Sequence, residues 1–338
     1  MIFLNDLTFL LPELFIFFSL SVLLLGNVFN NEFKFKFVNK PGISSYNCIH
    51  IENIKTIFLT VFLVSLIASV QPFANFILFE CQLSINIFNY FVKLLLFVFS
   101  FLFFFINVNY IKWVISTQNF EFYFLIMGSI LGMLFMIMSN DFVIFYLSIE
   151  LQSVIFYIMA ASKKYSEVSV EAGLKYFVMG SLTSGFLIFG VSIIYGCTGT
   201  INFLDLITLF FNDEITSNMA DLEVGILFLI SGLLFKFSAA PFHNWVPDVY
   251  DGASVVITMF FSIIPKLPVF YFIIVVLNIV LFNYMSIWTF LLTTSAWLSI
   301  MLGSFGALYQ SHVKRFIAYT TISHVGFILL PLSLGTVD

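Results

Sequence analysis

Apolar runs of about twenty residues recur along the whole chain and are separated by short polar segments. A helix needs about 20 apolar residues to cross the hydrocarbon core of a bilayer, so each run predicts a transmembrane helix. Ten runs qualify: Leu7–Leu25, Ile57–Phe73, Ile87–Tyr110, Phe122–Met138, Phe142–Ala161, Ala172–Tyr195, Val224–Tyr250, Val255–Phe282, Ile287–Tyr309 and Phe316–Leu334. The pattern predicts an all-α, polytopic membrane protein with ten transmembrane helices and no soluble domain.

Composition excludes several classes of protein. Of the 338 residues, 61% are hydrophobic and 9% are charged, whereas soluble domains contain about 25% charged residues. A net charge of -5 with a single arginine argues against nucleic acid as a partner. The three cysteines form no CxxC pair, so no disulfide framework, zinc site or iron–sulfur site is predicted. Membrane lipids are the expected surroundings.

The basic residues predict how the chain is oriented. We name the two sides of the membrane A and B and place the N-terminus on side B. Successive loops between the ten spans then lie on alternate sides, so nine lysines and arginines fall in side-A loops and none in side-B loops. The nine are Lys34, Lys36, Lys40, Lys55, Lys112, Lys163, Lys164, Lys314 and Arg315. Basic loops face the cytoplasm or the matrix, so we expect side A there and both termini on side B.

Four ionisable residues lie near the middle of predicted spans: Glu150, Lys236, Lys266 and His324. A charged side chain at that depth costs at least about 2.5 kcal/mol, and such residues usually pair, face the bundle interior or line a wet path. A glutamate beside a buried lysine stabilises the ammonium form, so a change at the glutamate can make the lysine hold or release a proton. The alternative is that each residue is simply a satisfied hydrogen-bond partner, and for His324 we prefer that alternative.

Other charged residues near span ends have ordinary explanations. Lys93 lies near the start of the third run, where snorkelling to the interface suffices to explain it. For Lys175, near the side-A end of the sixth run, snorkelling competes with function. Glu13 follows a proline and fits helix packing, and Asp141 is placed to cap the helix that carries Glu150.

The seventh run contains a helix break. Pro241 lacks a backbone N–H and clashes with the preceding turn, and Lys236 lies about one turn earlier. Pro265 and Pro268 likewise bracket Lys266. Broken helices at membrane depth mark ion sites in many transporters. The alternative is that each proline only kinks its helix for packing. Two distortions, each beside a lysine, favour an ion-transfer site over this alternative.

Four segments resemble one protein family. Residues 241–253, PFHNWVPDVYDGA, are similar to the signature PFHxWxPDVYxGAP. The other three are LSIELQS at 147–153, EAGLKY at 171–176 and VKRFIAYTTISHVG at 313–326. Together they resemble the family of subunit 2 of mitochondrial NADH:ubiquinone oxidoreductase (complex I), equivalent to subunit N of the bacterial enzyme.

The resemblance implies a role for each candidate residue. Glu150 is then the glutamate that modulates Lys236 on the broken helix, and Lys266 passes the proton toward the protein centre. Lys175 lies along the path from side A, and His324 belongs to a central polar axis. The chain itself is expected to hold no cofactor.

The resemblance also implies partners and a location. Partner subunits of the NADH:ubiquinone reductase carry FMN, iron–sulfur clusters and ubiquinone. The expected neighbours are other membrane-arm subunits of complex I, including the paralogous antiporter-like subunit 4. The expected location is the mitochondrial inner membrane, with both termini on the intermembrane-space side.

The sequence departs from the family pattern in two places. Ser254 stands where the signature has proline. Long family members have about fourteen spans in two inverted five-helix repeats. We therefore expect residues 1–118 to form a three-helix segment, 119–282 a complete antiporter-like repeat, and 283–338 the start of a second repeat that stops after helix ten. A separate chain is expected to supply the remaining helices.

Two other functions stay open at this point. One is an Mrp-like cation/proton antiporter subunit, against which the Val249–Tyr250 part of the signature argues. The other is a structural scaffold that does not pump protons. Retention of Glu150, Lys236 and Lys266 argues against a scaffold, because three charges in the membrane are costly.

Overall fold

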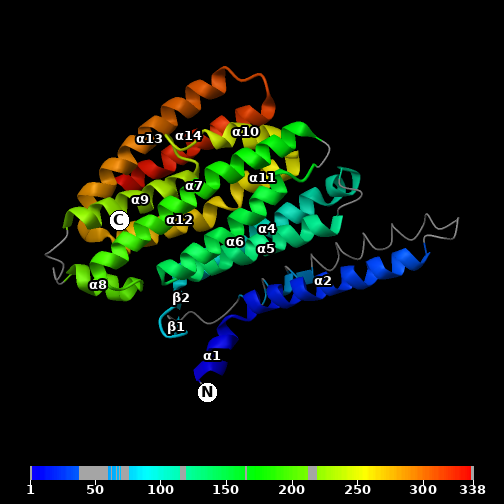
Figure 1. Ribbon diagram of the computed structural model, residues 1–338, viewed down its shortest axis with the longest axis horizontal. Helices are drawn as coiled ribbons and strands as arrows, with labels where there is room; N and C mark the ends of the chain where they lie inside the picture. Colours follow the sequence, from blue (N-terminus) through cyan, green and yellow to red (C-terminus); the bar gives the residue numbers. More distant parts are fainter. Residues whose placement is uncertain are drawn as a thin grey trace.

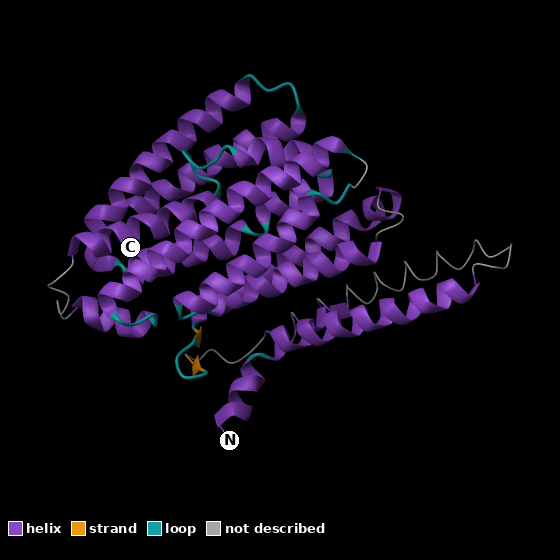
Figure 2. Cartoon of the chain, in the orientation of Figure 1, coloured by secondary structure: helices purple, strands orange, loops and turns teal. Residues whose placement is uncertain are grey.

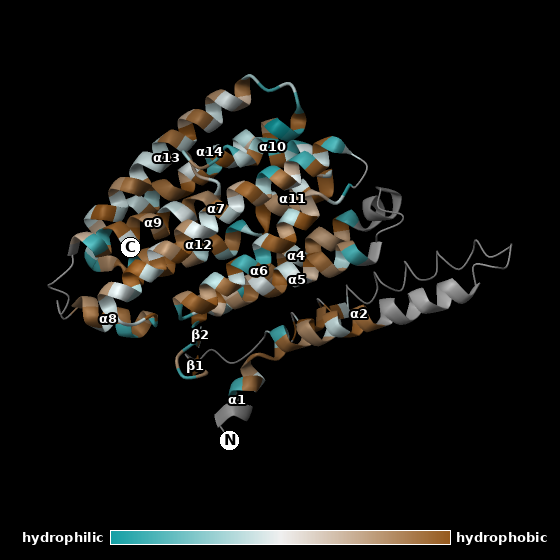
Figure 3. Cartoon of the chain, viewed as in Figure 1, coloured by the Kyte–Doolittle hydropathy of each residue, from teal (hydrophilic) through white to brown (hydrophobic). Residues whose placement is uncertain are grey.

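The structure is a computed structural model that describes residues 2–37, 60–61, 63–65, 67, 69, 76–114, 119–163, 166–211 and 219–335. Long helices run side by side in one bundle (Figure 1), with short connections between them (Figure 2). Hydrophobic residues follow the helices along most of their length (Figure 3). α1 and the end of α14 lie at the end of the bundle that holds the strands and α8 (Figure 1).

The described elements follow the predicted runs closely. The helices are α1 (Ile2–Phe9), α2 (Leu11–Phe37), α4 (Ile87–Val114), α5 (Asn119–Met138), α6 (Phe142–Ala160), α7 (Glu167–Thr198), α8 (Phe203–Phe211), α9 (Met219–Phe237), α10 (Trp245–Gly252), α11 (Val255–Ile263), α12 (Lys266–Val275), α13 (Met285–Leu308) and α14 (Val313–Ser333). A π-helical turn, Val276–Val280, and a 3-10 turn, Phe282–Tyr284, join α12 to α13.

Seven helices in the described part of the chain are long and apolar enough to cross a membrane. They are Ile87–Asn107, Glu121–Met138, Phe142–Ala160, Glu167–Thr198, Val255–Val280, Phe282–Leu308 and Val313–Ser333. Leu11–Leu25 is a shorter apolar helix, and most of the predicted span Ile57–Phe73 lies outside the described residues. The chain is therefore a multi-pass membrane protein, while the number ten stays a prediction.

The all-α prediction misses one β-hairpin. β1 (Phe76–Leu78) pairs antiparallel with β2 (Leu83–Ile85), and Leu83 also bridges to Ser139 after α5. Three consecutive residues in the turn have positive φ values, at Phe79, Glu80 and Cys81. Strands of three residues leave no readable period in a sequence that is apolar almost everywhere.

A second element was not predicted. α8 lies in the loop between the sixth and seventh runs, and it buries Phe203, Leu206 and Phe210 on one face. This i, i+3, i+7 spacing is that of an amphipathic helix resting on the bundle.

α5 is the most buried of the seven candidate spans, with 72% of its residues inside the protein. It packs against α2, α4, α6 and α12. A helix that is apolar all round belongs in the centre of a bundle. α5 thus gives α6 and α12, which carry Glu150 and Lys266, a common apolar support.

α13 and α14 form a tight helical hairpin. Gly303 lies so close to α14 that a Cβ atom there would come within 2.6 Å of the backbone nitrogen of Ser323. Gly326 faces α13 in the same way, since a Cβ atom there would come within 2.8 Å of the carbonyl oxygen of Ala296. Small residues allow this approach between helices in a membrane, where close packing replaces the hydrophobic effect as the driving force.

We expect Gly303→Ala to lower the Tm of the solubilised protein, because the new methyl group meets backbone atoms that cannot rotate away. Gly185→Ala in α7 is the matched control, since a Cβ there meets nothing within 4 Å. Alanine is a better helix former than glycine by about 0.8–1.0 kcal/mol, so this control is expected to keep or raise the Tm. Equal effects of the two substitutions would contradict the packing.

Candidate functional site

The seventh predicted span is divided where the sequence places its break. α9 ends with Ser238 in the left-handed region, at φ 68°. The N–H of Ser238 donates to the carbonyl of Phe235, and the N–H of Ala239 donates to the carbonyl of Leu234. These two bonds form a Schellman motif, which stops the helix directly after Lys236 and Phe237.

Side chains satisfy the backbone groups that the break frees. The indole Nε1 of Trp245 donates to the carbonyl of Phe235 at 3.3 Å. The Ser299 hydroxyl of α13 accepts the Ala240 N–H at 2.8 Å. Irregular backbone at membrane depth is tolerated only where protein or water satisfies it. Specific hydrogen bonds from α10 and α13 therefore stabilise the break.

A second break places the other lysine. α11 ends at Ile263, Pro265 follows, and Lys266 is the first residue of α12. Lys236 thus lies in the last turn of one helix and Lys266 in the first turn of another. A helix C-terminus carries a partial negative charge and an N-terminus a partial positive one. The two ammonium groups are in opposite electrostatic surroundings.

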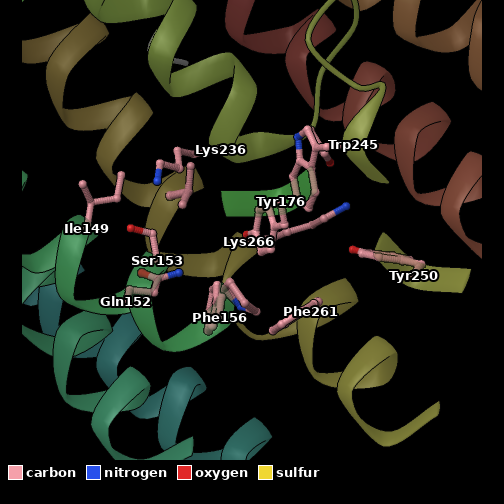
Figure 4. A pocket seen from close by; sticks show the side chains of 13 residues that line it. Ile149, Gln152, Ser153, Phe156, Tyr176, Lys236, Trp245, Tyr250, Phe261 and Lys266 are labelled. Atoms are coloured by element: carbon pink, nitrogen blue, oxygen red, sulfur yellow. The ribbon is translucent and has the colours of Figure 1, made fainter. Parts of the chain in front are cut away.

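Both lysines line one cavity (Figure 4). Its other polar lining residues are Gln152 and Ser153 of α6, Tyr176 of α7, Ser238 after α9, and Trp245 and Tyr250 of α10. The cavity leaves about 30 Å³ for the centres of water molecules, where one water needs about 10–15 Å³. A polar cavity of this size can hold water between the lysines.

The lysines point to different parts of this cavity. In Figure 4 the amine of Lys236 is directed toward Ile149 and Ser153, and that of Lys266 toward Tyr250. The ring of Tyr176 stacks on Trp245, with centroids 4.6 Å apart. Within the described residues neither lysine forms an ion pair within 4.0 Å, so both amines are left to the cavity.

Glu150 lies beside the cavity and not in its lining. Its side chain is half-buried, on the edge between the outward residues Leu147 and Leu151 and the inward residues Ile149 and Ser153. Its Oε1 is buried and has no hydrogen-bond partner. The carboxylate interacts electrostatically with Lys236, without direct contact. The structure therefore brings Lys236 and Lys266 to one cavity and places Glu150 at its edge, near Lys236.

Lys175 lies outside this group. Half of its side chain is exposed, and its Nζ is 3.0 Å from both Glu171 of its own helix and Asp248 of α10. His324 also lies apart, exposed on the outward face of α14. Neither residue is part of the cavity lining.

The acidic residues of the signature hold α10 in place. Asp248 binds Lys175, and the carboxylate of Asp251 is 2.9 Å from Nε of Arg315. Nζ of Lys314 donates to the carbonyls of Asp251 and Ala253, at 3.0 and 2.8 Å, which terminate α10. The side-A ends of α7 and α14 thus clamp the short helix that follows the break.

The snorkelling interpretation of Lys93 is wrong. Lys93 is 5% exposed, and its Nζ lies 2.6 Å from Oε1 of Glu13, which is 1% exposed. The sequence holds a usable signal for this pair. Each residue lies six positions into an apolar run that starts on side B, so the two opposite charges share one depth.

The predicted cap at Asp141 is correct in position but not in contact. Asp141 is the N-cap residue of α6, yet its side chain makes no capping hydrogen bond and its Oδ1 is buried without a partner. Burial, and secondly the Asp205 carboxylate, raise the pKa of Asp141 to about 6.

Ser254, the departure from the signature, is the N-cap residue of α11.

Residues 139–338 match the NADH:quinone oxidoreductase/Mrp antiporter transmembrane family. NADH-ubiquinone oxidoreductase chain 2 of Marchantia polymorpha is 38% identical over 339 residues, which cover 99% of this chain and 67% of that protein. NADH-quinone oxidoreductase subunit N of Pelagibacter ubique is 35% identical over 332 residues, covering 98% and 66%.

This chain belongs to the NADH:quinone oxidoreductase/Mrp antiporter family.

Solved structures agree with this family fold. A chain of the archaeal membrane-bound sulfane sulfur reductase superposes with a TM-score of 0.77 at 26% identity, covering 97% of this chain and 64% of that chain. A chain of the Mrp complex from Dietzia sp. DQ12-45-1b has a TM-score of 0.73 at 18% identity, with 97% and 59% covered. The chain spans about two thirds of the length of the family members it matches end to end.

The part of the chain that the structure describes holds no group of three or more His, Cys, Asp or Glu residues that could bind a metal ion.

We expect Ser299→Ala to lower the free energy of unfolding by about 1–3 kcal/mol, because it leaves the buried Ala240 N–H without an acceptor. Ser304→Ala in the same helix is the control, since its exposed hydroxyl bonds only to Met301. Thermal unfolding of the solubilised protein measures both. A loss for Ser304→Ala as large as for Ser299→Ala would contradict this assignment.

We expect Asp141→Asn to raise the Tm at pH 7.5, with a gain that shrinks as the pH falls through about 6. The folded pKa exceeds the unfolded value, so the folded state carries a penalty above pH 6 that protonation removes. Tm measured from pH 5 to 8 tests this. Asp221→Asn, which removes an exposed carboxylate, is the control. A Tm gain for Asp141→Asn that grows toward pH 5 would contradict the shift.

Proposed function

We propose that this chain is a proton-translocating membrane-arm subunit of respiratory complex I, in the mitochondrial inner membrane. The observation that carries the proposal is one cavity, large enough for water, lined by two lysines that each lie at a helix break. Two half-buried amines that form no ion pair among the described residues are costly in a membrane, and the fold supplies helix ends and polar side chains to keep them. The family relationship supports the same function, since the relatives named above are NADH–quinone oxidoreductase subunits.

The proposed transfer uses the chain's own groups. Lys236 holds a proton as the ammonium form, which both the C-terminal end of α9 and the nearby Glu150 carboxylate stabilise. When the carboxylate is neutralised or moves away, Lys236 gives the proton to water in the cavity. The neutral amine of Lys266 takes that proton and becomes the ammonium. The positive end of α12 then favours its onward release.

We propose that Lys175 lies at the side-A approach to this cavity. Its ion pair with Asp248 reaches the helix that follows the break, and its neighbour Tyr176 lines the cavity. Exchange of protons between the exposed carboxylates around Lys175 and the cavity supplies the side-A end of the route.

We propose that further membrane helices cover the outward face of α14. His324 is exposed there, as is Thr320 in part, and an ionisable residue facing lipid is costly. A separate chain that supplies the remaining helices, and the paralogous antiporter-like subunit 4, are the proposed neighbours. Under this arrangement His324 continues the polar axis into the covering helices.

The two other candidate functions lose support. Chains of the Mrp complex and of complex I share this fold, so fold alone does not choose between them. Identity of 38% over 99% of this chain favours the complex I branch. A scaffold needs no water-sized cavity between two unpaired lysines.

We expect Lys236→Met to abolish proton pumping through this chain in the assembled complex. Removing a positioned proton-transfer group slows its step by about 10²–10⁴-fold. Proton uptake per NADH oxidised, measured in sealed vesicles, is the readout, with native gel electrophoresis to confirm assembly. Lys163→Met, at an exposed loop lysine, is the charge-matched control. Full pumping by assembled Lys236→Met would favour the scaffold.

A further inference from the structure

A second acid–amine pair lies in the N-terminal part of the chain, before residues 139–338. Glu13 of α2 and Lys93 of α4 form an ion pair of 2.6 Å, and both side chains are more than nine-tenths buried. This pair is not part of the cavity that Lys236 and Lys266 share.

The pair is incomplete as a purely structural contact. Oε1 of Glu13 accepts from Lys93, but Oε2 is buried and has no hydrogen-bond partner among the described residues. A buried ion pair repays its desolvation cost only when the remaining lone pairs are satisfied. The free oxygen is an acceptor held beside a fixed positive charge, which is a place where a proton can bind.

One hydrogen bond between buried side chains joins α4, which carries Lys93, to α12, which carries Lys266. Asn89 lies four residues before Lys93, so the two share one face of α4. The Tyr271 hydroxyl of α12 donates to Oδ1 of Asn89. Nδ2 of Asn89 donates to the carbonyl of Ser84 at 2.9 Å, which fixes the amide with its oxygen toward Tyr271.

This connection leads toward one end of the bundle. Tyr271 lies five residues after Lys266 in α12, about 7.5 Å along the helix axis. Asn89 is in the first turn of α4, directly after the β-hairpin. By the loop assignment from the basic residues, that end is side B. Tyr271 therefore lies nearer side B than Lys266 does, and Asn89, which it bonds, lies about one helical turn from Lys93.

We propose that Glu13 and Lys93 form a proton-exchange site that passes protons from Lys266 toward side B. This inference rests on the proposed function. The Lys266 ammonium loses a proton, which the Tyr271 hydroxyl and water carry to Oε2 of Glu13. Glu13 becomes the neutral acid while Lys93 stays an ammonium. Release of that proton toward side B restores the carboxylate, and Asn89 acts as the positioning residue for Tyr271.

A simple structural role makes a different prediction. If the pair only fastens α2 to α4, then any substitution that removes both buried charges together leaves pumping intact once the protein has assembled. If the pair exchanges protons, pumping is lost even when the helices still pack. The two roles are separated by the ratio of protons pumped to NADH oxidised, measured on assembled complex only.

The first experiment is the double variant Glu13→Gln with Lys93→Met, which leaves no unpaired charge between α2 and α4. We expect native gels to show assembled complex and the proton-to-NADH ratio in sealed vesicles to fall, because the step through Glu13 slows by about tenfold or more. An unchanged ratio in assembled complex overturns the proposal.

The second experiment does not depend on whether the double variant folds. Tyr271→Phe removes one hydroxyl and keeps the ring, and we expect it to lower the same ratio. Tyr195→Phe is the control, since Tyr195 lies on α7 with 53% of its surface exposed. Equal, undiminished ratios for both variants overturn the proposed connection.

Lys236→Met, measured in parallel, separates this inference from the proposed function. If Lys236→Met stops pumping while the Glu13 and Tyr271 variants pump normally, the proposed function stands and the side-B exchange site is refuted. If Lys236→Met pumps normally, the proposed function itself is refuted.

Discussion

The structure depends on one constraint: within a membrane, every backbone N–H and C=O group must find its partner inside the protein. A continuous helix satisfies its own backbone groups, but this chain interrupts two of its helices. Each break lies beside a lysine. At the first break the freed groups are bonded by Ser238, Trp245 and Ser299. Because these bonds come from three different elements, the break is stable only when the whole bundle is assembled around it.

The same constraint explains the clamp on α10. A helix of eight residues is too short to hold itself in the membrane. Asp248 and Asp251 tie it to α7 and α14, and Lys314 binds its last carbonyls. The two acidic residues of segment 241–253 thus have a structural role, because they hold α10 where Trp245 and Tyr250 line the cavity.

Much of the site could be predicted because charged residues and prolines are rare in an apolar sequence, so each one is informative. Glu150, Lys236 and Lys266 stand out among membrane-spanning residues, and the prolines indicate where helices break. The interpretation of Lys93 and the capping contact of Asp141 were wrong for a common reason. Both required knowing which helix lies next to which, and hydropathy gives no neighbours. Depth alone, compared between Glu13 and Lys93, was the one sequence signal that could have paired them.

The sequence by itself determined that the chain crosses a membrane repeatedly and where its helices break, since both follow from the local cost of polar groups in hydrocarbon. Tertiary structure alone decided that Lys236 and Lys266 share a cavity, that Glu150 lies at its edge, and that Lys175 and His324 lie outside it. The reason is physical: the direction of a side chain depends on helix rotation, and helix rotation is set by packing with neighbours distant in the sequence.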